Sequence, residues 1–435
     1  MALGAIARRK PTPPMQPAAL LEAQTELVGR VLRFEHPADR VVGDFFREQR
    51  RLGARDRQVL ADGAYGLLRR LALLRHLASS AEGGTSLERR LAILAWRGDE
   101  RVLLAALDER ERDWLRRCRE IDVQALPEPL RHNLPEWLAA PVRRRLGAEF
   151  WAWVDAVEAP APLDLRVNAW KGDRPAVLEQ LDRAAIAASP TPYSPLGIRV
   201  AGKPALQKSD PFEHGLVEVQ DEGSQLLALL VGARRGEIVV DFCAGAGGKT
   251  LALGAQMRNT GRLYAFDVSG HRLAALQPRL ARSGLANVHP AQLAHERDAR
   301  LERLVGKVDR VLVDAPCSGS GTLRRHPDLK WRQSGESVAG LAVSQRSILG
   351  AAARLLKPGG RLVYATCSVL DAEGEAVADE FERQAGSGFL RIPARDALAR
   401  AGVAGAESLV EGDRMRLWSH RHATDGFFAA LWQRS

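Results

Sequence analysis

The sequence predicts an α/β protein whose C-terminal part, residues 236–435, forms a doubly wound parallel sheet. Strand-like apolar segments alternate with helical segments along this part of the chain. A glycine-rich loop, DFCAGAGGKT at 241–250, follows the first of these strands and opens a helix. One cysteine follows each of two later strands, in VLVDAPCS and LVYATCS. Sheets of this kind bind ligands at the carboxyl ends of their strands, so we expect the functional site there.

Three further regions are predicted to precede the sheet. Residues 1–18 contain four prolines and no apolar periodicity, which predicts a disordered basic tail. Residues 19–145 place apolar side chains at spacings of three and four between Gly, Pro and Ser breaks, which predicts an all-helical domain. Within residues 155–235, LDLRVN alternates in strand fashion and further short strands follow, so a small α+β subdomain is predicted.

Composition narrows the class of protein. The chain has 435 residues, 46% of them hydrophobic, which is enough to bury a sizeable core. No apolar run approaches the roughly 20 residues that span a bilayer, and the N-terminal charges do not follow the order of a secretory signal. We therefore expect a cytoplasmic protein, by default a monomer. The net charge of +10 is compatible with a polyanionic partner such as RNA.

The four cysteines do not suggest a metal site or a disulfide scaffold. Cys118, Cys243, Cys317 and Cys367 lie far apart, and none belongs to a Cys-x-x-Cys pair. The HRH segment at 420–422 has no visible partner ligands, so no metal is expected. Any single cysteine is more often a buried apolar thiol than a reactive one.

The glycine-rich loop has two interpretations. Its tail, Gly248-Lys249-Thr250, imitates the end of a phosphate-binding P-loop, but that pattern requires glycine where Cys243 stands. The alternative is a nucleoside cofactor, whose ribose hydroxyls bind a carboxylate at the end of the second strand. Asp267 occupies that position in YAFDVS. The pair of loop and acid favours a ribose-bearing cofactor.

The two strand-end cysteines are predicted to face one cleft. Cys317 follows the fourth strand of the sheet and Cys367 the fifth, so both reach the same edge as Asp314. A thiolate that adds to C6 of cytosine converts C5 into a nucleophile able to accept a methyl group from S-adenosylmethionine. A free thiol with a pKa of about 8.5 is only slightly ionised at neutral pH. A catalytic thiol should therefore lie near Lys or Arg.

Taken together, these motifs resemble a known family. DFCAGAGGKT, FDVS, DAPCSGSGTLRRHPDLKW and YATCSV, in this order and spacing, are similar to the cofactor and catalytic motifs of the Sun (Fmu, or RsmB-type) RNA cytosine-5 methyltransferases. The resemblance covers about residues 160–435, and the helical region before it resembles the family's NusB-like RNA-binding domain. It implies a class I methyltransferase Rossmann-like fold, S-adenosylmethionine as cofactor, and methylation of cytosine C5 in small-subunit (16S) ribosomal RNA.

The resemblance also assigns roles to residues. It makes Cys367 the nucleophile, Cys317 the residue that helps to release the product, and Asp314 an acid that lines both cofactor and base. Without the family this order is not obvious, because DNA cytosine-5 methyltransferases attack with the cysteine of a Pro-Cys motif. The cofactor would contact Asp267, Asp314 and the loop residues Cys243, Ala244, Gly245, Ala246, Gly247, Gly248 and Lys249.

Three segments depart from the family pattern, and one of them is the final PH of the family, which appears here as Ser419-His420. Ala294 stands where the family has an acid for the adenine side of the cofactor, and His295, Glu296 or Asp298 are the candidate replacements. The usual PEEN after the nucleophile appears here as DAEG at 371–374.

A basic run leaves the catalytic edge directly, in TLRRHPDLKWRQ. We predict that its cations contact RNA phosphates, although such runs are often only solvated loops. The predicted contacts are Arg324, Arg325, Lys330 and Arg332.

The function expected from the sequence is S-adenosylmethionine-dependent methylation of cytosine C5 in RNA. The alternatives are a P-loop NTPase and a non-catalytic RNA-binding protein of ribosome assembly.

Overall fold

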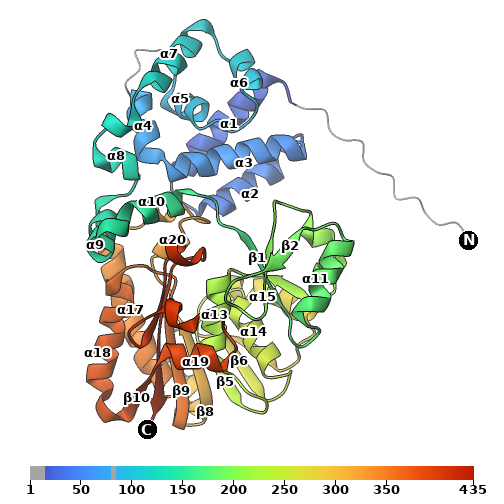
Figure 1. The fold of residues 1–435 in the computed structure, drawn as a ribbon, viewed down its shortest axis with the longest axis vertical. Helices are drawn as coiled ribbons and strands as arrows, with labels where there is room; N and C mark the ends of the chain where they lie inside the picture. The colour runs from blue at the N-terminus through green and yellow to red at the C-terminus, as the bar shows by residue number, and fades with distance from the viewer. Residues whose placement is uncertain (1–14, 80–84) are drawn as a thin grey trace, which may run out of the picture. The chain divides into compact units, whose positions relative to one another are not determined.

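The computed structural model describes residues 15–79 and 85–435. The chain divides into two compact units (Figure 1). One runs to Arg144 and includes His326–Arg332; the other holds Arg145–Arg325 and Gln333–Ser435. Most of the predicted N-terminal tail lies outside the described residues. Its last two residues already belong to helix α1 (Pro17–Val31), where Pro17 takes the first helical position and its missing N–H loses no hydrogen bond.

The first unit is built from helices around one apolar core. Helix α1 packs against α3 and α5, and its buried face includes Leu21, Leu27 and Val28. Ser86 and Asp108 cap the amino ends of two helices through their side chains. The helices after α1 are α2 (Ala38–Glu48), α3 (Ala54–Arg69), α4 (Leu71–Ser79), α5 (Leu87–Leu94), α6 (Glu100–Ala106), α7 (Glu109–Glu120), η1 (Val123–Ala125), α8 (Glu128–His132) and α9 (Glu136–Leu146), whose last two residues belong to the second unit.

A short segment from the middle of the chain completes this helical core. In residues 326–332, which hold helix α16 (Leu329–Arg332), the indole of Trp331 packs against the core and donates a hydrogen bond to the Leu68 carbonyl (2.7 Å). The Asp328 carboxylate accepts a hydrogen bond from the Ala38 N–H (3.2 Å). These contacts attach the segment to the amino end of α2 and the carboxyl end of α3.

The second unit begins with a small antiparallel sheet. Its strand order is β2-β3-β1-β4, with β1 in the centre and its Leu165 and Val167 fully buried. Helix α11 contributes Val177 and Leu181 to the same core. The elements, in chain order, are η2 (Gly147–Glu149), α10 (Phe150–Glu158), β1 (Leu163–Val167), α11 (Arg174–Arg183), β2 (Ala188–Pro190), β3 (Gly197–Val200), η3 (Leu206–Lys208), α12 (Asp210–Glu213), β4 (Val217–Val219) and α13 (Glu222–Val231).

The large sheet of this unit confirms the predicted doubly wound architecture. Five parallel strands run in the order β9-β8-β5-β6-β7, and β13 pairs antiparallel with β9. The chain leaves β5 on one side for β6 and returns on the other side as β8, so the strand order reverses beside β5. The strands are β5 (Ile238–Asp241), β6 (Arg262–Asp267), β7 (Val288–Gln292), β8 (Val308–Asp314), β9 (Leu356–Thr366), β10 (Phe389–Ile392), β11 (Val410–Glu411), β12 (Arg414–Leu417) and β13 (Phe427–Arg434).

Helices cover both faces of this sheet, because its central strands are apolar on both sides (Figure 1). Along β5, Val239 belongs to the core under α13 and α14, and Val240 to the opposite core under α17 and α18. The elements that connect the strands are α14 (Gly248–Gln256), α15 (Gly270–Ser283), η4 (Ala299–Leu304), η5 (Ser320–Thr322), α17 (Gly335–Ala353), η6 (Asp371–Glu373), α18 (Glu375–Ala385), η7 (Gly386–Gly388), α19 (Ala394–Arg400), η8 (Ala406–Leu409) and α20 (Ser419–His422). Across residues 15–79 and 85–435, none of the helices combines the length and the apolar character that a membrane crossing demands.

Candidate active site

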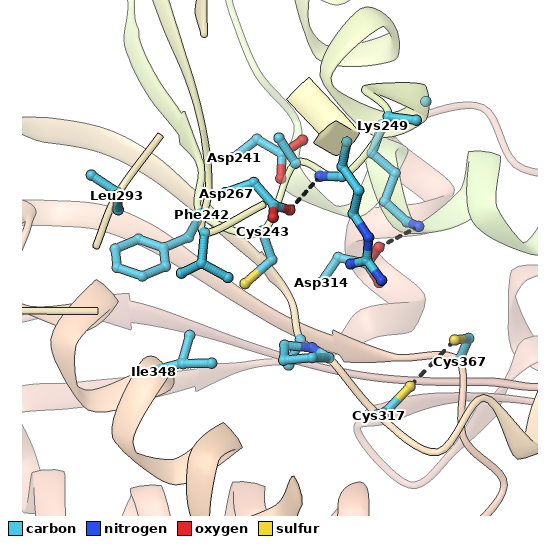
Figure 2. Close-up of a pocket in the computed structure, with 18 of the residues that line it drawn as sticks. Asp241, Phe242, Cys243, Lys249, Asp267, Leu293, Asp314, Cys317, Ile348 and Cys367 are labelled. Carbon is cyan, nitrogen blue, oxygen red and sulfur yellow. Dashed lines mark hydrogen bonds and ion pairs between the residues drawn. The ribbon is translucent and has the colours of Figure 1, made fainter. Parts of the chain in front are cut away.

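A pocket of about 480 Å³ lies at the carboxyl ends of β5, β6, β8 and β9, where the strand order reverses. Figure 2 shows the side chains that line it. Every residue that the sequence predicted for the cofactor loop lines this pocket, except Gly247. The lining also includes Asp241, Asp267, Asp314, Cys317 and Cys367.

The glycine-rich loop needs its glycines for two different reasons. Gly245 and Gly247 both have positive φ, of 54° and 82°, which side-chain-bearing residues rarely adopt. A Cβ at Gly247 would also lie 2.1 Å from Cδ1 of Leu276, inside the packed core. The loop can therefore keep this path only with glycine at 247, and helix α14 starts at the next residue.

Asp267 holds the glycine-rich loop from the neighbouring strand. It ends β6, and its Oδ2 accepts a hydrogen bond from the Gly245 N–H (2.8 Å). Its Oδ1 accepts a second one from the Ser269 N–H (2.7 Å). The structure thus brings together the loop and the acid that the sequence singled out.

Asp241 is a pocket residue that the sequence reasoning missed. It ends β5, is 1% exposed, and its Oδ2 accepts a hydrogen bond from the Thr250 hydroxyl (2.7 Å). Its Oδ1 is buried without a hydrogen-bond partner among the described residues. Burial raises the pKa of Asp241 to about 7. The signal was present in the sequence, because this acid ends its strand as Asp267 and Asp314 end theirs.

The two strand-end cysteines meet in the pocket. Their Sγ atoms lie 3.3 Å apart. Figure 2 shows the two side chains pointing toward one another. Parallel pairing of β8 with β9, which sets Asp314 opposite Ala365, brings the two loops together. Cys243, the third thiol of the pocket, sits in the glycine-rich loop, and burial raises its pKa well above the ordinary value.

A lysine and an aspartate form an ion pair at the same edge. Nζ of Lys249 lies 2.7 Å from Oδ2 of Asp314, and both side chains are largely buried. Burial alone would lower the pKa of Lys249, but the Asp314 carboxylate and, more weakly, Cys367 outweigh it and raise the pKa. The sequence predicts that a catalytic thiol lies near Lys or Arg. The Lys249 ammonium is a cation whose charge interacts with Cys367.

Four basic residues were predicted to bind RNA. In the structure, each of them contacts another group of the protein. Arg324 and Arg325 both bond to the Asp425 carboxylate, at 3.3 and 2.7 Å. Lys330 is 3% exposed and donates to the Arg69 carbonyl, and Arg332 lies 3.5 Å from Asp328. Their contact with phosphate stays a prediction.

Ala294 stands where the family has an acid near the adenine of the cofactor, and three nearby residues were candidates to replace that acid. The structure places two of them in the pocket and one outside it. His295 and Glu296 line the pocket, and the Ser347 hydroxyl donates a hydrogen bond to Glu296 (2.7 Å), which lowers its pKa. Asp298 instead bonds to the Ala294 N–H and to the Arg300 side chain. Within residues 15–79 and 85–435, no cluster of His, Cys, Asp and Glu has the composition to hold a metal ion.

The doubly wound sheet, with its glycine-rich loop after β5, an acid at the end of β6 and β13 antiparallel beside β9, has the Rossmann-like fold of class I methyltransferases. Residues 228–433 match the model of a family described as 16S rRNA methyltransferase RsmB/F. Residues 134–207 match a second model, described as the ferredoxin-like domain of RsmF/B-like methyltransferases. The chain belongs to the RsmB/F family.

Individual relatives agree with this assignment. The "Ribosomal RNA small subunit methyltransferase B" of Sodalis glossinidius is 37% identical over 57% of this chain, and the match spans 56% of that protein's length. The "Probable ribosomal RNA small subunit methyltransferase B" of Bacillus subtilis is 31% identical over 70% of this chain and 68% of its own. The solved structure of PH0851 has a TM-score of 0.79 at 25% identity, covering 97% of this chain and 99% of that one.

Proposed function

We propose that this protein methylates C5 of cytosine in 16S ribosomal RNA, with S-adenosylmethionine as methyl donor and a covalent protein-RNA intermediate. The observation that carries the proposal is the pair of thiols, 3.3 Å apart, in a pocket that also holds the Lys249–Asp314 ion pair and the glycine-rich loop. The names of the relatives support ribosomal RNA as the substrate class.

The pocket fits S-adenosylmethionine on three observations. Asp267, at the end of the second strand, suits ribose hydroxyls. The backbone at Gly245 is open, because a Cβ there would meet nothing within 4 Å, so a ligand can approach it closely. The unpartnered Oδ1 of Asp241 can accept a hydrogen bond from the amino end of the ligand. When bound, this cofactor supplies an electrophilic methyl group.

The residues of the chain supply the rest of the chemistry. The Cys367 sulfur bonds to C6 of the cytosine, and electron density moves to C5, which then accepts the methyl group. Lys249 stabilises the thiolate that attacks, because its buried ammonium and the charge of Cys367 attract one another across the pocket. In the second stage a base takes the C5 proton, the electron pair of the C5–H bond reforms the C5–C6 double bond, and the Cys367–C6 bond breaks with its electron pair leaving on the sulfur. We assign help in this release to Cys317, whose sulfur contacts that of Cys367.

Two cysteine variants and one control test the proposal. Each is incubated with a 16S ribosomal RNA fragment and S-adenosylmethionine, and 5-methylcytosine is measured by mass spectrometry. Cys367→Ala should lose methyl transfer, and Cys317→Ala should accumulate an adduct that appears as a shifted band on a denaturing gel. Cys118→Ala is the matched control, because this buried thiol belongs to the helical core and not to the pocket. Full activity of Cys367→Ala would refute its role as nucleophile.

The rival interpretations have less support. A P-loop would turn Lys249 toward a phosphate, whereas its ammonium pairs with Asp314. A non-catalytic RNA-binding protein has no use for the two thiols, and wild-type activity in the assay above would exclude it.

A further inference from the structure

A buried glutamate that has no role in the proposed reaction lies beneath both cysteines. Glu373 is 0% exposed, and its carboxylate accepts four hydrogen bonds. Its Oε1 accepts from the Ser318 N–H (2.8 Å) and the Gln345 amide (3.1 Å). Its Oε2 accepts from the hydroxyls of Ser318 (2.5 Å) and Ser368 (2.6 Å). The Ser318 N–H and the Gln345 amide nitrogen can only donate, so Oε1 is the acceptor in both of these bonds.

These hydrogen bonds hold the residues that follow the two thiols. Ser318 follows Cys317 after β8, and Ser368 follows Cys367 after β9. One carboxylate therefore ties two separate loops together next to their reactive atoms. The backbone carbonyl of Glu373 is itself held by the Tyr364 hydroxyl (2.6 Å), from inside β9.

The charges around the two sulfurs differ in sign. On the side of Cys367 lies the Lys249 ammonium, paired with Asp314. The pKa of Cys317 is raised well above its ordinary value, first by its hydrogen bond with Cys367, then by burial, and then by the negative charges of Cys367 and Glu373. Further polar or charged groups near these loops are Ser320, whose hydroxyl lies within hydrogen-bond distance of those of Ser318 and Ser368, and Tyr364, whose pKa is raised by burial, an effect that the charge of Arg346 partly offsets. Arg416 donates to the Ser368 carbonyl and pairs with Asp371 and Glu375.

We propose that Glu373 is a positioning residue that sets the division of labour between the cysteines. Its carboxylate clamps both loops and sets a negative charge against Cys317, which leaves the attack on the base to Cys367. The inference rests on the proposed function, since it takes Cys367 as the attacking residue.

Thiol alkylation in the free protein tests this without RNA or cofactor. Wild type and Glu373→Gln are treated with iodoacetamide over a range of pH, and the modified peptides of Cys317 and Cys367 are quantified separately by mass spectrometry. Removal of the charge should lower the midpoint of Cys317 alkylation by about one pH unit, which is about a tenfold faster reaction below the midpoint. An unchanged midpoint of Cys317 in a folded variant would overturn the proposal.

Two further variants separate charge from loosened structure. Glu375→Gln makes the same charge change two residues away, but its carboxylate bonds to Arg416 and Arg145 and to neither serine. Its Cys317 midpoint should match wild type. Ser318→Ala keeps the charge of Glu373 and removes the hydroxyl that donates to its Oε2. The carboxylate is then less neutralised, so the midpoint of Cys317 alkylation should rise.

The alkylation midpoints of the variants, taken together, show whether Glu373 acts through its charge. Equal acceleration of both cysteines at every pH, without a shift in midpoint, would mean that Glu373 is only structural. If Glu373→Gln does not fold, Ser318→Ala decides alone, and an unchanged or lowered midpoint refutes the inference. Because the assay omits RNA, a failure of the proposed function would appear in methyl transfer and not in these midpoints.

Discussion

Asp241 should make cofactor binding depend on pH. Its carboxyl lines the pocket with one oxygen bonded to Thr250 and the other without a partner among the described residues. Burial raises its pKa to about 7, so in the free protein it is protonated below that pH and ionised above it. A ligand with a cationic amino group favours the ionised form. Affinity should therefore rise as pH increases through about 7 and fall as pH decreases.

The size of the effect follows from this pKa. If only the ionised form binds well, affinity falls tenfold for each pH unit below the pKa. Between about pH 8 and about pH 5, the ionised fraction drops from about nine-tenths to about one-hundredth. The expected loss of affinity over this range is therefore close to a hundredfold, or about 2.7 kcal/mol.

Calorimetric titration with S-adenosylhomocysteine measures this directly. Asp241→Asn is the matched control, because an amide can still accept the Thr250 hydrogen bond but does not titrate. The ratio of the wild-type affinity to that of the variant cancels the titration of the ligand's own amino group. A ratio that stays constant between about pH 5 and about pH 8 would refute the reasoning.

Three other substitutions test separate parts of the structure. Lys249→Met should lower kcat and slow the alkylation of Cys367 by iodoacetamide at neutral pH, and an unchanged alkylation rate would exclude this lysine as the stabilising cation. Arg325→Ala should lower the unfolding free energy in urea by about 3 kcal/mol, because Asp221 loses its ion pair with this arginine and the buried Asp425 keeps only Arg324; unchanged stability with weakened RNA binding would instead favour the predicted phosphate contact. Gly247→Ala should weaken S-adenosylhomocysteine binding more than tenfold, since its Cβ enters the core, whereas Gly202→Ala, also at positive φ but in open space, should not.

The strands and their terminal residues were predictable because their signal is local. A buried parallel strand is an unbroken apolar run, and the acid, glycine or cysteine after it has a known place at the sheet edge. This placed Asp267, Asp314 and both cysteines of the thiol pair in one pocket. Asp241 was not predicted, because the glycines that follow it are the stronger local signal of a cofactor loop.

The environment of the basic run was not predictable, because its partners are distant in sequence. A sequence of closely spaced arginines is typical of a solvated or RNA-facing loop. The carboxylates that bind Arg325, those of Asp221 and Asp425, lie about a hundred residues away on either side. The role of Glu373 was hidden for the same reason: its donor Ser318 comes from a different strand end.

Residues 326–332 are synthesised long after the helices whose core they complete. The helical core receives the indole of Trp331 and the hydrogen bonds of Asp328, although its other helices end near residue 146. During synthesis those helices leave the ribosome well before the segment that completes their core. We expect the helical unit to reach full stability only after residue 332 has emerged. Cutting the chain at residue 144, between the two units, would remove residues 326–332 from this helical core.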